Sequence, residues 1–334
     1  MRCIQMTAAG EPEVLQPAEL EAPVLPADSL RVALHGAGVN PVDTKLRARG
    51  LYGPAPLPAI LGCDGAGEVL KRGSSVTGFS TGTRVWYCYG GIGVTPGNYA
   101  EQNVVPAIAC ARAPRTLDLT LAAAGPLVLI TAWEALYDRA RLTAGQTLLI
   151  HAAAGGVGHV AVQLAKLRGA RVIATVSTAE KDAFVRALGA DEVVRYTQTN
   201  VVEATRSLTA GRGADVVFDT IGGKVFLQSL EACAPYGDVV TILEPPPEVS
   251  WKAVRPKNLR IGFELMLTPM MTNDPAGLAR HAAILQRCAE WIDMGQLRIE
   301  VEAVLPLRDA AEAHRRVESG HTRGKIVLDT RAAG

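Results

Sequence analysis

The pattern of apolar and polar positions changes character along the chain, and its first third predicts a β-rich domain. Up to about residue 122, short alternating or apolar runs are separated by turns rich in glycine and proline. The expected strands are Leu30–Leu34, Gly67–Leu70, Thr83–Tyr89 and Ala100–Val105. Few helices are expected in this part.

From about Leu121, β-branched apolar runs alternate with helical patterns, which is typical of a parallel sheet covered by helices on both faces. Helices are expected up to Gly169 and over Glu180–Leu188, where a glycine again follows. The expected strands are Thr147–His151, Arg171–Val176, Glu192–Tyr196, Asp215–Asp219, Val239–Ile242 and Leu259–Phe263. This alternation predicts an α/β fold with a doubly wound, parallel six-stranded Rossmann sheet.

The last part of the chain departs from this alternation. A long helical pattern over Leu278–Met294 precedes a strand-like run, Ile299–Val304. A shorter helix over Arg308–Glu318 and a strand over Lys325–Leu328 are then expected.

Composition limits the classes of function. The 334 residues are enough for about two domains. A net charge of +1 indicates neither a nucleic-acid partner nor an anionic membrane. The N-terminus has no apolar core of signal-peptide length, and the most apolar stretch, Ala122–Ala135, is too short to span a bilayer. A cytoplasmic protein without a membrane partner is therefore expected.

The cysteines favour neither disulfides nor a thiolate metal site, because no two of them form a C-x-x-C pair. They are Cys3, Cys63, Cys88, Cys110, Cys233 and Cys288. Reduced thiols in a reducing compartment are expected.

A phosphate-binding turn is the strongest local motif. The strand ending near His151 enters Ala152–Gly158, which reads AAAGGVG, and an apolar helix follows at once. Gly155 and Gly156 lack a Cβ, so a pyrophosphate can approach the N–H groups at the helix N-terminus, and Gly158 allows close packing of helix on strand. A purely structural turn is the alternative. The strands on either side favour a dinucleotide site.

The end of the second strand of this unit indicates the cofactor. NAD-preferring sites usually carry Asp or Glu there to bind the ribose 2′-hydroxyl. The segment Ala174–Glu180 has no acid at the strand tip, and Lys181 follows. A hydroxyl from Ser177 and the Lys181 cation favour a 2′-phosphate and hence NADPH. The alternative for Lys181 is an ordinary solvated lysine.

Several motifs in the same order resemble the zinc-independent quinone oxidoreductase (zeta-crystallin-like) branch of the medium-chain dehydrogenase/reductase superfamily. The resemblance covers nearly all of the chain. Its motifs are Gly38–Asp43, Leu61–Val69, Thr131–Leu136, Ala154–Gly158, Leu188–Asp191, Ala214–Asp219 and Gly320–Leu328.

The resemblance implies a domain organisation. Residues 1–122 would form a GroES-like catalytic domain, 123–268 a Rossmann NADPH-binding domain, and 269–334 a segment that returns to the catalytic domain. The active site would lie in the cleft between the domains. Similar enzymes are homodimers or homotetramers, joined partly through the sheet edge that Leu259–Leu267 would form here.

The resemblance also implies site residues. The expected cofactor contacts are Thr131, Ala154, Gly155, Gly156, Val157, Ser177, Lys181, Tyr196, Thr241 and Ile242. Asn40, Asp43 and Tyr52 would border the nicotinamide pocket. Lys45 stands where many relatives have an aromatic residue, so the mouth of the substrate pocket is expected to differ.

Asn40 and Tyr52 are the candidate catalytic residues. Tyr52 could donate a hydrogen bond to a carbonyl oxygen or form a wall of the pocket, and Asn40 could donate too or hold the turn before Pro41. The histidines form no evident constellation. His151 is expected to order the phosphate turn.

No metal is expected. Zinc-dependent members of the superfamily carry a cysteine within Gly38–Asp43 and a histidine in the segment that begins at Gly62, whereas this chain has Asn40 and Cys63-Asp64. An open catalytic zinc site needs three protein ligands. Cys63 is therefore expected to be a small buried thiol.

Without a Lewis acid, acceptors that spread negative charge over a π system are favoured. The expected function is NADPH-dependent hydride transfer to a quinone or an α,β-unsaturated carbonyl. The alternatives are a reductase of another activated alkene, such as an enoyl thioester or a haloacrylate, and an NADPH-binding sensor with little turnover.

Overall fold

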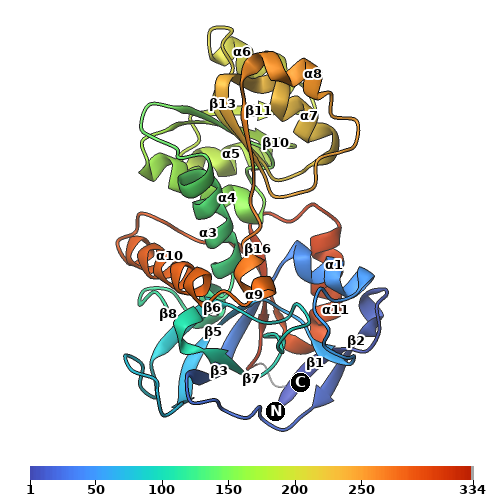
Figure 1. The fold of residues 1–334 in the computed structure, drawn as a ribbon, viewed down its shortest axis with the longest axis vertical. Coiled ribbons are helices and arrows are strands. Elements are labelled where there is room, and N and C mark those ends of the chain that lie inside the picture. The colour runs from blue at the N-terminus through green and yellow to red at the C-terminus, as the bar shows by residue number, and fades with distance from the viewer. Residues whose placement is uncertain (332–334) are drawn as a thin grey trace. The chain divides into compact units, whose positions relative to one another are not determined.

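The computed structural model describes residues 1–331. These form two compact units, one made of Met1–Ile130 together with the segment from Leu267 onward, the other of Thr131–Met266 (Figure 1). The division near residue 130 falls inside helix α3 (Pro126–Trp133), C-terminal to the boundary expected at residue 122. The apolar pattern therefore changes more than one helical turn before the boundary between the two compact units.

The larger sheet of the first unit is mixed. Its order is β15-β16-β3-β5-β6-β8, and β7 also pairs with β3. Its strands are β3 (Ser29–Val39), β5 (Asp64–Arg72), β6 (Arg84–Cys88), β7 (Gln102–Pro106), β8 (Ala111–Arg112), β15 (Val301–Pro306) and β16 (Lys325–Asp329). Because β16 pairs antiparallel with β3, the C-terminal segment completes a sheet begun near the N-terminus (Figure 1).

Among the described residues, a smaller sheet, six α-helices and three short 3-10 helices complete this unit. The small sheet has the order β2-β1-β4, with β1 (Arg2–Met6), β2 (Leu15–Glu19) and β4 (Ala59–Ile60). The α-helices, besides the start of α3, are α1 (Pro41–Arg49), α2 (Leu119–Ala122), α9 (Thr268–Thr272), α10 (Pro275–Asp293) and α11 (Ala310–Glu318).

Helix α1 was not expected, because its sequence has no apolar periodicity. Its start is specified by a capping box, in which the Asn40 side chain faces the N3 backbone and the Asp43 carboxylate accepts from the Asn40 N–H. Pro41 occupies the first helical turn, where no N–H is needed. Capping chemistry thus forms a helix that the apolar pattern does not predict.

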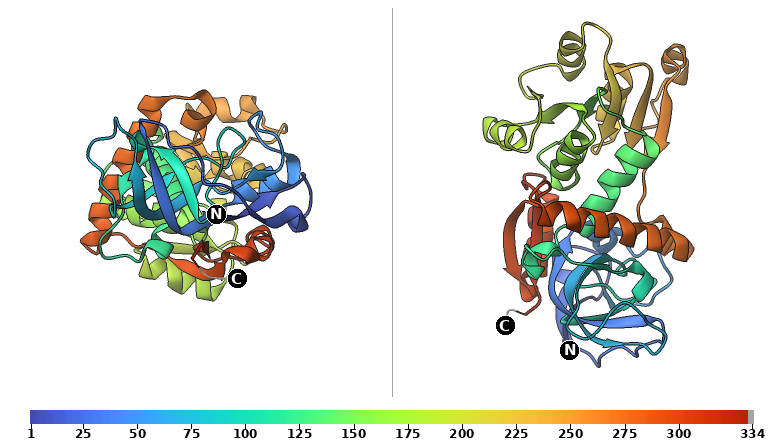
Figure 2. Two further views of the ribbon diagram at one scale, coloured as in Figure 1. Left: turned by 90° about the horizontal axis from the view of Figure 1, so that it is seen from below. Right: turned by 90° about the vertical axis from the view of Figure 1, so that its left-hand side faces the viewer.

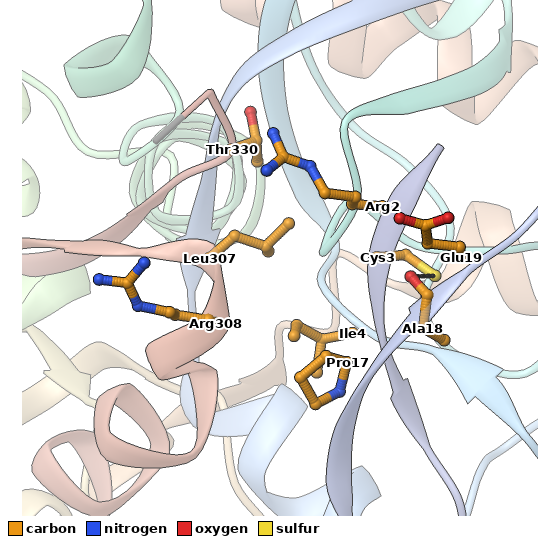
Figure 3. Close-up of a pocket in the computed structure, with 9 residues that line it drawn as sticks. All are labelled: Arg2, Cys3, Ile4, Pro17, Ala18, Glu19, Leu307, Arg308 and Thr330. Atoms are coloured by element: carbon orange, nitrogen blue, oxygen red, sulfur yellow. Dashed lines mark hydrogen bonds between the residues drawn. The ribbon is translucent and has the colours of Figure 1, made fainter. Parts of the chain in front are cut away.

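A cavity of about 470 Å³ lies in this unit beside the small sheet (Figure 3). Its polar groups are largely used by the fold itself. Arg2 pairs with Glu101, and the Thr330 hydroxyl donates to the Leu34 carbonyl at 2.6 Å. We assign no function to this cavity.

The second unit contains the expected parallel six-stranded sheet, with the order β11-β10-β9-β12-β13-β14. The strands are β9 (Thr147–Ile150), β10 (Arg171–Val176), β11 (Glu192–Arg195), β12 (Ala214–Asp219), β13 (Cys233–Thr241) and β14 (Arg260–Phe263). This is the order of a dinucleotide-binding sheet, and the predicted fold class is confirmed. Strand β13 starts earlier than the expected Val239, because Pro235 and Gly237 in its first half are residues that strands usually lack.

Helices lie on both faces of this sheet (Figures 1 and 2). They are η3 (Glu134–Arg139, a π-helix), α4 (Gly156–Leu167), α5 (Ala179–Ala187), α6 (Val201–Leu208), α7 (Gly223–Ala232), α8 (Trp251–Val254) and η4 (Arg255–Lys257). Leu149, Ile173 and Val217 of the sheet are buried in one core cluster with Phe226 of α7. Among the described residues, no helix is both long and apolar enough to cross a membrane.

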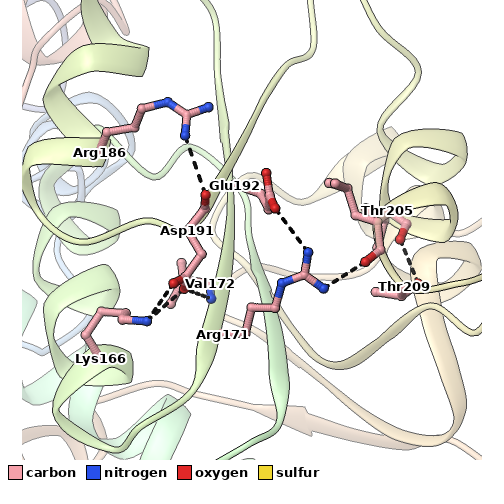
Figure 4. Close-up of polar contacts among 9 residues, drawn as sticks. Lys166, Arg171, Val172, Arg186, Asp191, Glu192, Thr205 and Thr209 are labelled. Atoms are coloured by element: carbon pink, nitrogen blue, oxygen red, sulfur yellow. Dashed lines mark hydrogen bonds and ion pairs between the residues drawn. The ribbon is translucent and has the colours of Figure 1, made fainter.

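Asp191 ties helix α4 to the sheet (Figure 4). Its carboxylate accepts from Lys166 Nζ at 2.8 and 2.9 Å and from the Val172 N–H at 2.7 Å. Arg171 on β10 reaches Glu192 on β11 at 3.1 Å. These contacts set the spacing of β10 against α4, the helix that begins at the phosphate turn.

Candidate cofactor and active site

The phosphate turn leaves the start of helix α4 open. Ala152 adopts a left-handed conformation with φ of 49°, and the helix begins at Gly156 with Gly155 as its N-cap. Because Gly155 has no side chain, no side-chain cap occupies the first N–H groups of the helix. Those N–H groups are available to an anion.

Close packing explains the last glycine of the turn. A Cβ on Gly158 would lie 2.4 Å from the Ala152 carbonyl oxygen and 2.7 Å from the Ala153 Cα. The turn is also held from β10, because Thr175 Oγ1 accepts from the Ala152 N–H at 3.2 Å. The Ala153 N–H donates to the Thr175 carbonyl at 3.0 Å.

A cavity of about 300 Å³ adjoins this turn. It lies at the carboxyl ends of the strands, where the sheet order reverses direction, and this is the place where α/β sheets bind ligands. Its lining residues are His151, Ala152, Thr175, Tyr196, Thr199, Asn200, Val201, Ile221, Val225 and Gln228.

Of the three residues expected around a 2′-phosphate, Ser177 and Tyr196 follow the ends of the adjacent strands β10 and β11. The Tyr196 N–H donates to the Val176 carbonyl, and the Ser177 carbonyl accepts from Thr197 Oγ1 at 3.0 Å. Lys181 lies in the first turn of α5. The fold therefore brings Ser177, Lys181 and Tyr196 to the same end of the sheet.

His151 directly precedes the phosphate turn, and its role in ordering that turn stays a prediction. Its side chain is buried and lines the cavity, and its Nε2 has no hydrogen-bond partner among the described residues. Burial lowers the pKa of His151 to about 4, with Asp219 opposing the shift, so the ring is neutral. The ring therefore offers an unused polar atom to a ligand.

Asp219 organises the strand ends on the other side of the switch point. Its carboxylate accepts from the Ile221 and Gly222 N–H groups at 2.9 Å and from Thr241 Oγ1 at 3.1 Å. Thr241 is fully buried, and its hydroxyl is already hydrogen-bonded to Asp219. Ile242 is half-buried. Thr131, the other residue expected near the nicotinamide, is buried on α3.

Asn40, in the first unit, is fully buried, and both polar atoms of its amide are hydrogen-bonded. Its Nδ2 donates to Asp64 Oδ2 at 2.9 Å, and its Oδ1 accepts from Lys325 Nζ. The Leu127 N–H donates to the other oxygen of Asp64 at 2.7 Å. Asn40 thus holds a buried polar network together.

Asp43 extends this network. Its Oδ2 accepts from the Asn40 N–H at 2.9 Å and from the Tyr99 hydroxyl at 3.3 Å, and that hydroxyl lies 3.1 Å from His314 Nε2. Burial raises the pKa of Asp43 to about 7 despite the hydrogen bond from Asn40. Burial lowers the pKa of His314 to about 3.

Tyr52 follows the C-terminal end of helix α1, whereas Asn40 caps the N-terminal end of that helix. Its side chain is 54% exposed, whereas Asn40 is 0% exposed. The two share no hydrogen bond among the described residues. Lys45, on the same helix, is half-buried, and burial lowers its pKa. The structure does not join the two candidate catalytic side chains into one group.

Two family models match the chain. An alcohol dehydrogenase GroES-like domain matches residues 26–115, and a zinc-binding dehydrogenase domain matches residues 188–328. A quinone oxidoreductase of Pseudomonas aeruginosa is 35% identical over 97% of this chain and 98% of the relative. The chain belongs to the quinone oxidoreductase branch of the medium-chain dehydrogenase/reductase superfamily. It is an oxidoreductase, and the resemblance noted in the sequence is confirmed.

Further relatives of this oxidoreductase agree with that family. A 2-haloacrylate reductase of Burkholderia is 33% identical and covers 87% of each chain. The crystal structure of Escherichia coli quinone oxidoreductase complexed with NADPH matches with a TM-score of 0.87 and 30% identity, over 98% of this chain and all of that one.

The possible metal donors of the oxidoreductase are few. Within residues 1–331, no group of three or more His, Cys, Asp or Glu side chains is arranged to hold a metal ion. Cys63 is fully buried, as expected, and all the cysteines are unpaired thiols. The hydrogen bond with Cys88 lowers the pKa of Cys63, but burial and the nearby carboxylates of Asp43 and Asp64 together raise it to about 11, so the thiolate form is disfavoured.

Sequence reasoning did not assign several cavity residues of the oxidoreductase. Thr175, Asn200 and Ile221 line the cavity but lie outside the glycine motif. Their common signal is position, because each stands at or just beyond the carboxyl end of a predicted strand. The expected contacts by Ala154, Gly155, Gly156 and Val157 remain predictions.

Proposed function

We propose that this chain is a zinc-independent, NADPH-dependent oxidoreductase that reduces a quinone or an α,β-unsaturated carbonyl. The observation that carries the proposal is the site around the phosphate turn of the second unit. It combines an uncapped helix start, a cavity at the switch point and a buried histidine with an unused Nε2. Membership of the quinone oxidoreductase branch supports the same chemistry.

The residues at this site fit NADPH. The backbone of Ala154–Val157 would bind the pyrophosphate at the start of α4, and Gly158 keeps helix and strand in contact there. Ser177 and Lys181 would bind the 2′-phosphate, since no acid stands at the end of β10. Bound NADPH supplies the hydride. The solved relative complexed with NADPH supports this cofactor.

The residues near Asn40 do not fit zinc, although one matched family is described as zinc-binding. Both amide atoms of Asn40 are used, and the Lys325 ammonium already lies 3.7 Å from Asp64 Oδ2. A second cation there would face this buried positive charge at short range. The carboxylates of Asp64 and Asp43 already accept hydrogen bonds from Asn40, and burial disfavours the thiolate forms of Cys63 and Cys88. These features support a zinc-independent reaction.

The chain's own residues then act mainly by positioning. A quinone or enone delocalises the charge that develops on hydride addition, so a strong Lewis acid is not required. Tyr52, half-exposed, is the candidate hydrogen-bond donor to the acceptor oxygen. Asn40 would act through the network that holds helix α1 in place.

A second candidate function is reduction of another activated alkene. The 33% identical 2-haloacrylate reductase favours it, since that substrate is also a conjugated acceptor. An acceptor series that includes a haloacrylate and an enoyl thioester separates the two.

We also propose self-association through β14. Within residues 1–331, this strand pairs with β13 alone and forms the edge of the sheet, so its other side offers backbone groups for pairing with another strand. Phe263 is 60% exposed and Leu265 is 50% exposed beside it. A homodimer or homotetramer is expected by light scattering, and Phe263→Glu should shift it toward monomer. A monomeric wild type would contradict this.

The test of function is an NADPH-oxidation screen. It compares quinones, enones and activated alkenes with saturated ketones of matched size, with and without chelator. Conjugated acceptors should react fastest, and chelation should leave the rates unchanged. Faster turnover of saturated ketones, or loss of activity restored by zinc, would refute the proposal. Tight NADPH binding without any turnover would favour the sensor alternative.

A further inference from the structure

The glycine-rich loop Gly90–Gly97 of the first unit is bonded to the segment that carries Tyr52. The N–H groups of Tyr52 and Gly53 both donate to the Ile92 carbonyl at 3.0 Å. Tyr52 is the candidate hydrogen-bond donor to the acceptor oxygen, and it lies outside helix α1 and the strands of this unit. Its position therefore depends on the loop Gly90–Gly97.

A close approach of two glycines fixes the loop against this segment. A Cβ on Gly53 would lie 2.2 Å from the Gly93 carbonyl oxygen, and that oxygen accepts from the Ala55 N–H at 2.8 Å. Gly93 itself has a φ of 92°, a conformation that side chains rarely allow. The two backbones thus lie closer together than residues with side chains would permit.

The loop is also anchored to the rest of the unit. The Gly91 N–H donates to the Thr95 carbonyl at 3.0 Å and closes the loop on itself. The Gly97 N–H donates to the Ile60 carbonyl of β4 at 2.9 Å. The side chain of Ile92, at the centre of the loop, is 1% exposed. Side chains on this loop are therefore held in place by a well-bonded backbone.

Val94 is the residue of this loop whose side chain the core does not use. It is 51% exposed, and its Cγ2 lies against Gly53, since a Cβ on Gly53 would be 2.8 Å from it. Tyr52, which precedes Gly53, is 54% exposed. An aliphatic and an aromatic side chain thus stand exposed on two segments that hold each other in place. Binding sites for small molecules are lined by such side chains, together with a few polar groups that orient the ligand.

We propose that Val94 is a specificity-determining residue that contacts the ring of the acceptor while the Tyr52 hydroxyl binds its oxygen. This inference rests on the proposed function and extends it to the size of the acceptor. An aliphatic side chain packs well against the flat face of a quinone or enone. Because the loop is anchored, a larger side chain at this position takes space from the acceptor instead of moving aside.

The test compares Val94→Phe and Val94→Ala with wild type on a small and a large acceptor of each class. The pairs are p-benzoquinone with menadione, and methyl vinyl ketone with benzylideneacetone. The measured quantity is the ratio of kcat/KM for the large acceptor to kcat/KM for the small one. Val94→Phe should lower this ratio about tenfold and Val94→Ala should raise it, as expected for a change of a few carbon atoms in a pocket wall.

Two controls show where the effect arises. Val24→Phe changes a valine of the same unit that is 89% exposed, and it should leave the ratio as in wild type. The Kd for NADPH, measured by fluorescence titration, should be the same in wild type and in both Val94 variants. Because Val94 is exposed, the unfolding temperature should also stay unchanged. If Val94→Phe is unfolded, Val94→Ala decides.

The outcomes separate this inference from the proposed function. Any other pattern of ratios, or a loss of NADPH affinity as large as the loss of kcat/KM, would overturn the role of Val94 and leave the proposed function intact. No oxidation of NADPH by wild type with any quinone, enone or activated alkene would overturn both.

Discussion

The ammonium of Lys325 lies 3.7 Å from the carboxylate of Asp64, and both side chains are buried within the first unit. The same ammonium donates to the Asn40 side chain and to the Val39 carbonyl. Burial lowers the pKa of Lys325 and raises that of Asp64, while each charge opposes the shift of the other. The pair joins β16 to β5, two strands that lie far apart in the sequence.

Removing the cation alone should be strongly destabilising. Lys325→Met leaves Asp64 as an uncompensated buried charge, so the free energy of unfolding should fall by about 3–5 kcal/mol. Urea denaturation measures it. Lys71→Met, at an exposed position on β5, is the control. The double variant with Asp64→Asn should recover part of the loss. A Lys325→Met protein as stable as wild type would contradict the pairing.

Lys181 should discriminate between the two nicotinamide cofactors. A charge-assisted contact with the 2′-phosphate contributes about 1.5–3 kcal/mol, so Lys181→Ala should weaken NADPH binding roughly tenfold or more and NADH binding little. Titration of both cofactors checks this, with Lys71→Ala as the control. Equal losses for both would show that Lys181 does not contact the phosphate.

Gly158→Ala should damage the phosphate turn more than Gly155→Ala. The added Cβ would lie 2.4 Å from the Ala152 carbonyl oxygen in the first case and 3.3 Å in the second. Overpacking of this kind costs about 1–3 kcal/mol, so NADPH affinity and unfolding temperature should both fall for Gly158→Ala. The reverse order of effects on the unfolding temperature would be inconsistent with the packing described.

Stability should decline from pH 6.5 to 8. The pKa values of Asp43 and Glu264 are raised to about 7 and about 8, so these groups bind more protons folded than unfolded, and stability is lost as pH rises toward those values. The pKa values of His151 and His314 are lowered to about 4 and about 3, so their contribution is lost as pH falls below 6.5.

Below pH 6.5, the histidines and the carboxyl groups change the stability in opposite directions as pH rises. Above pH 6.5, the histidines no longer contribute to the change, and the two carboxyl groups lower the stability. Urea unfolding at pH 6.5 and 8.5 should therefore show a loss on the order of a few kcal/mol. Glu264→Gln should reduce it. A flat profile for wild type would contradict the raised pKa values.

The two candidate catalytic residues should respond differently to substitution. Tyr52→Phe removes an exposed hydroxyl that solvent can replace, so kcat with a quinone should fall by no more than about tenfold. Asn40→Ala removes both the bond to Asp64 and the acceptor of Lys325, so activity should fall further, along with stability. Steady-state rates and unfolding temperatures measure both. A larger loss of kcat for Tyr52→Phe would make Tyr52 the proton donor.

Much of the second unit could be predicted from the sequence alone. Its strands are buried on both faces and read as apolar runs, and the glycines of the phosphate turn meet steric demands made by their immediate neighbours. These are local properties, so periodicity and composition reveal them. Helix α1 was not predicted, because it has no apolar stripe and its start is specified by the capping box at Asn40.

The sequence by itself determined the order of the elements, the phosphate turn and the absence of an acid at the end of β10, since each depends on residues near one another in the chain. Only the tertiary structure decided how the buried charges are used. Asn40 is bound by Lys325, 285 residues away, and the buried Glu264 that follows β14 accepts from Arg139 of η3. A buried charge is tolerated only where a partner compensates for it, and the fold rather than the local sequence supplies that partner.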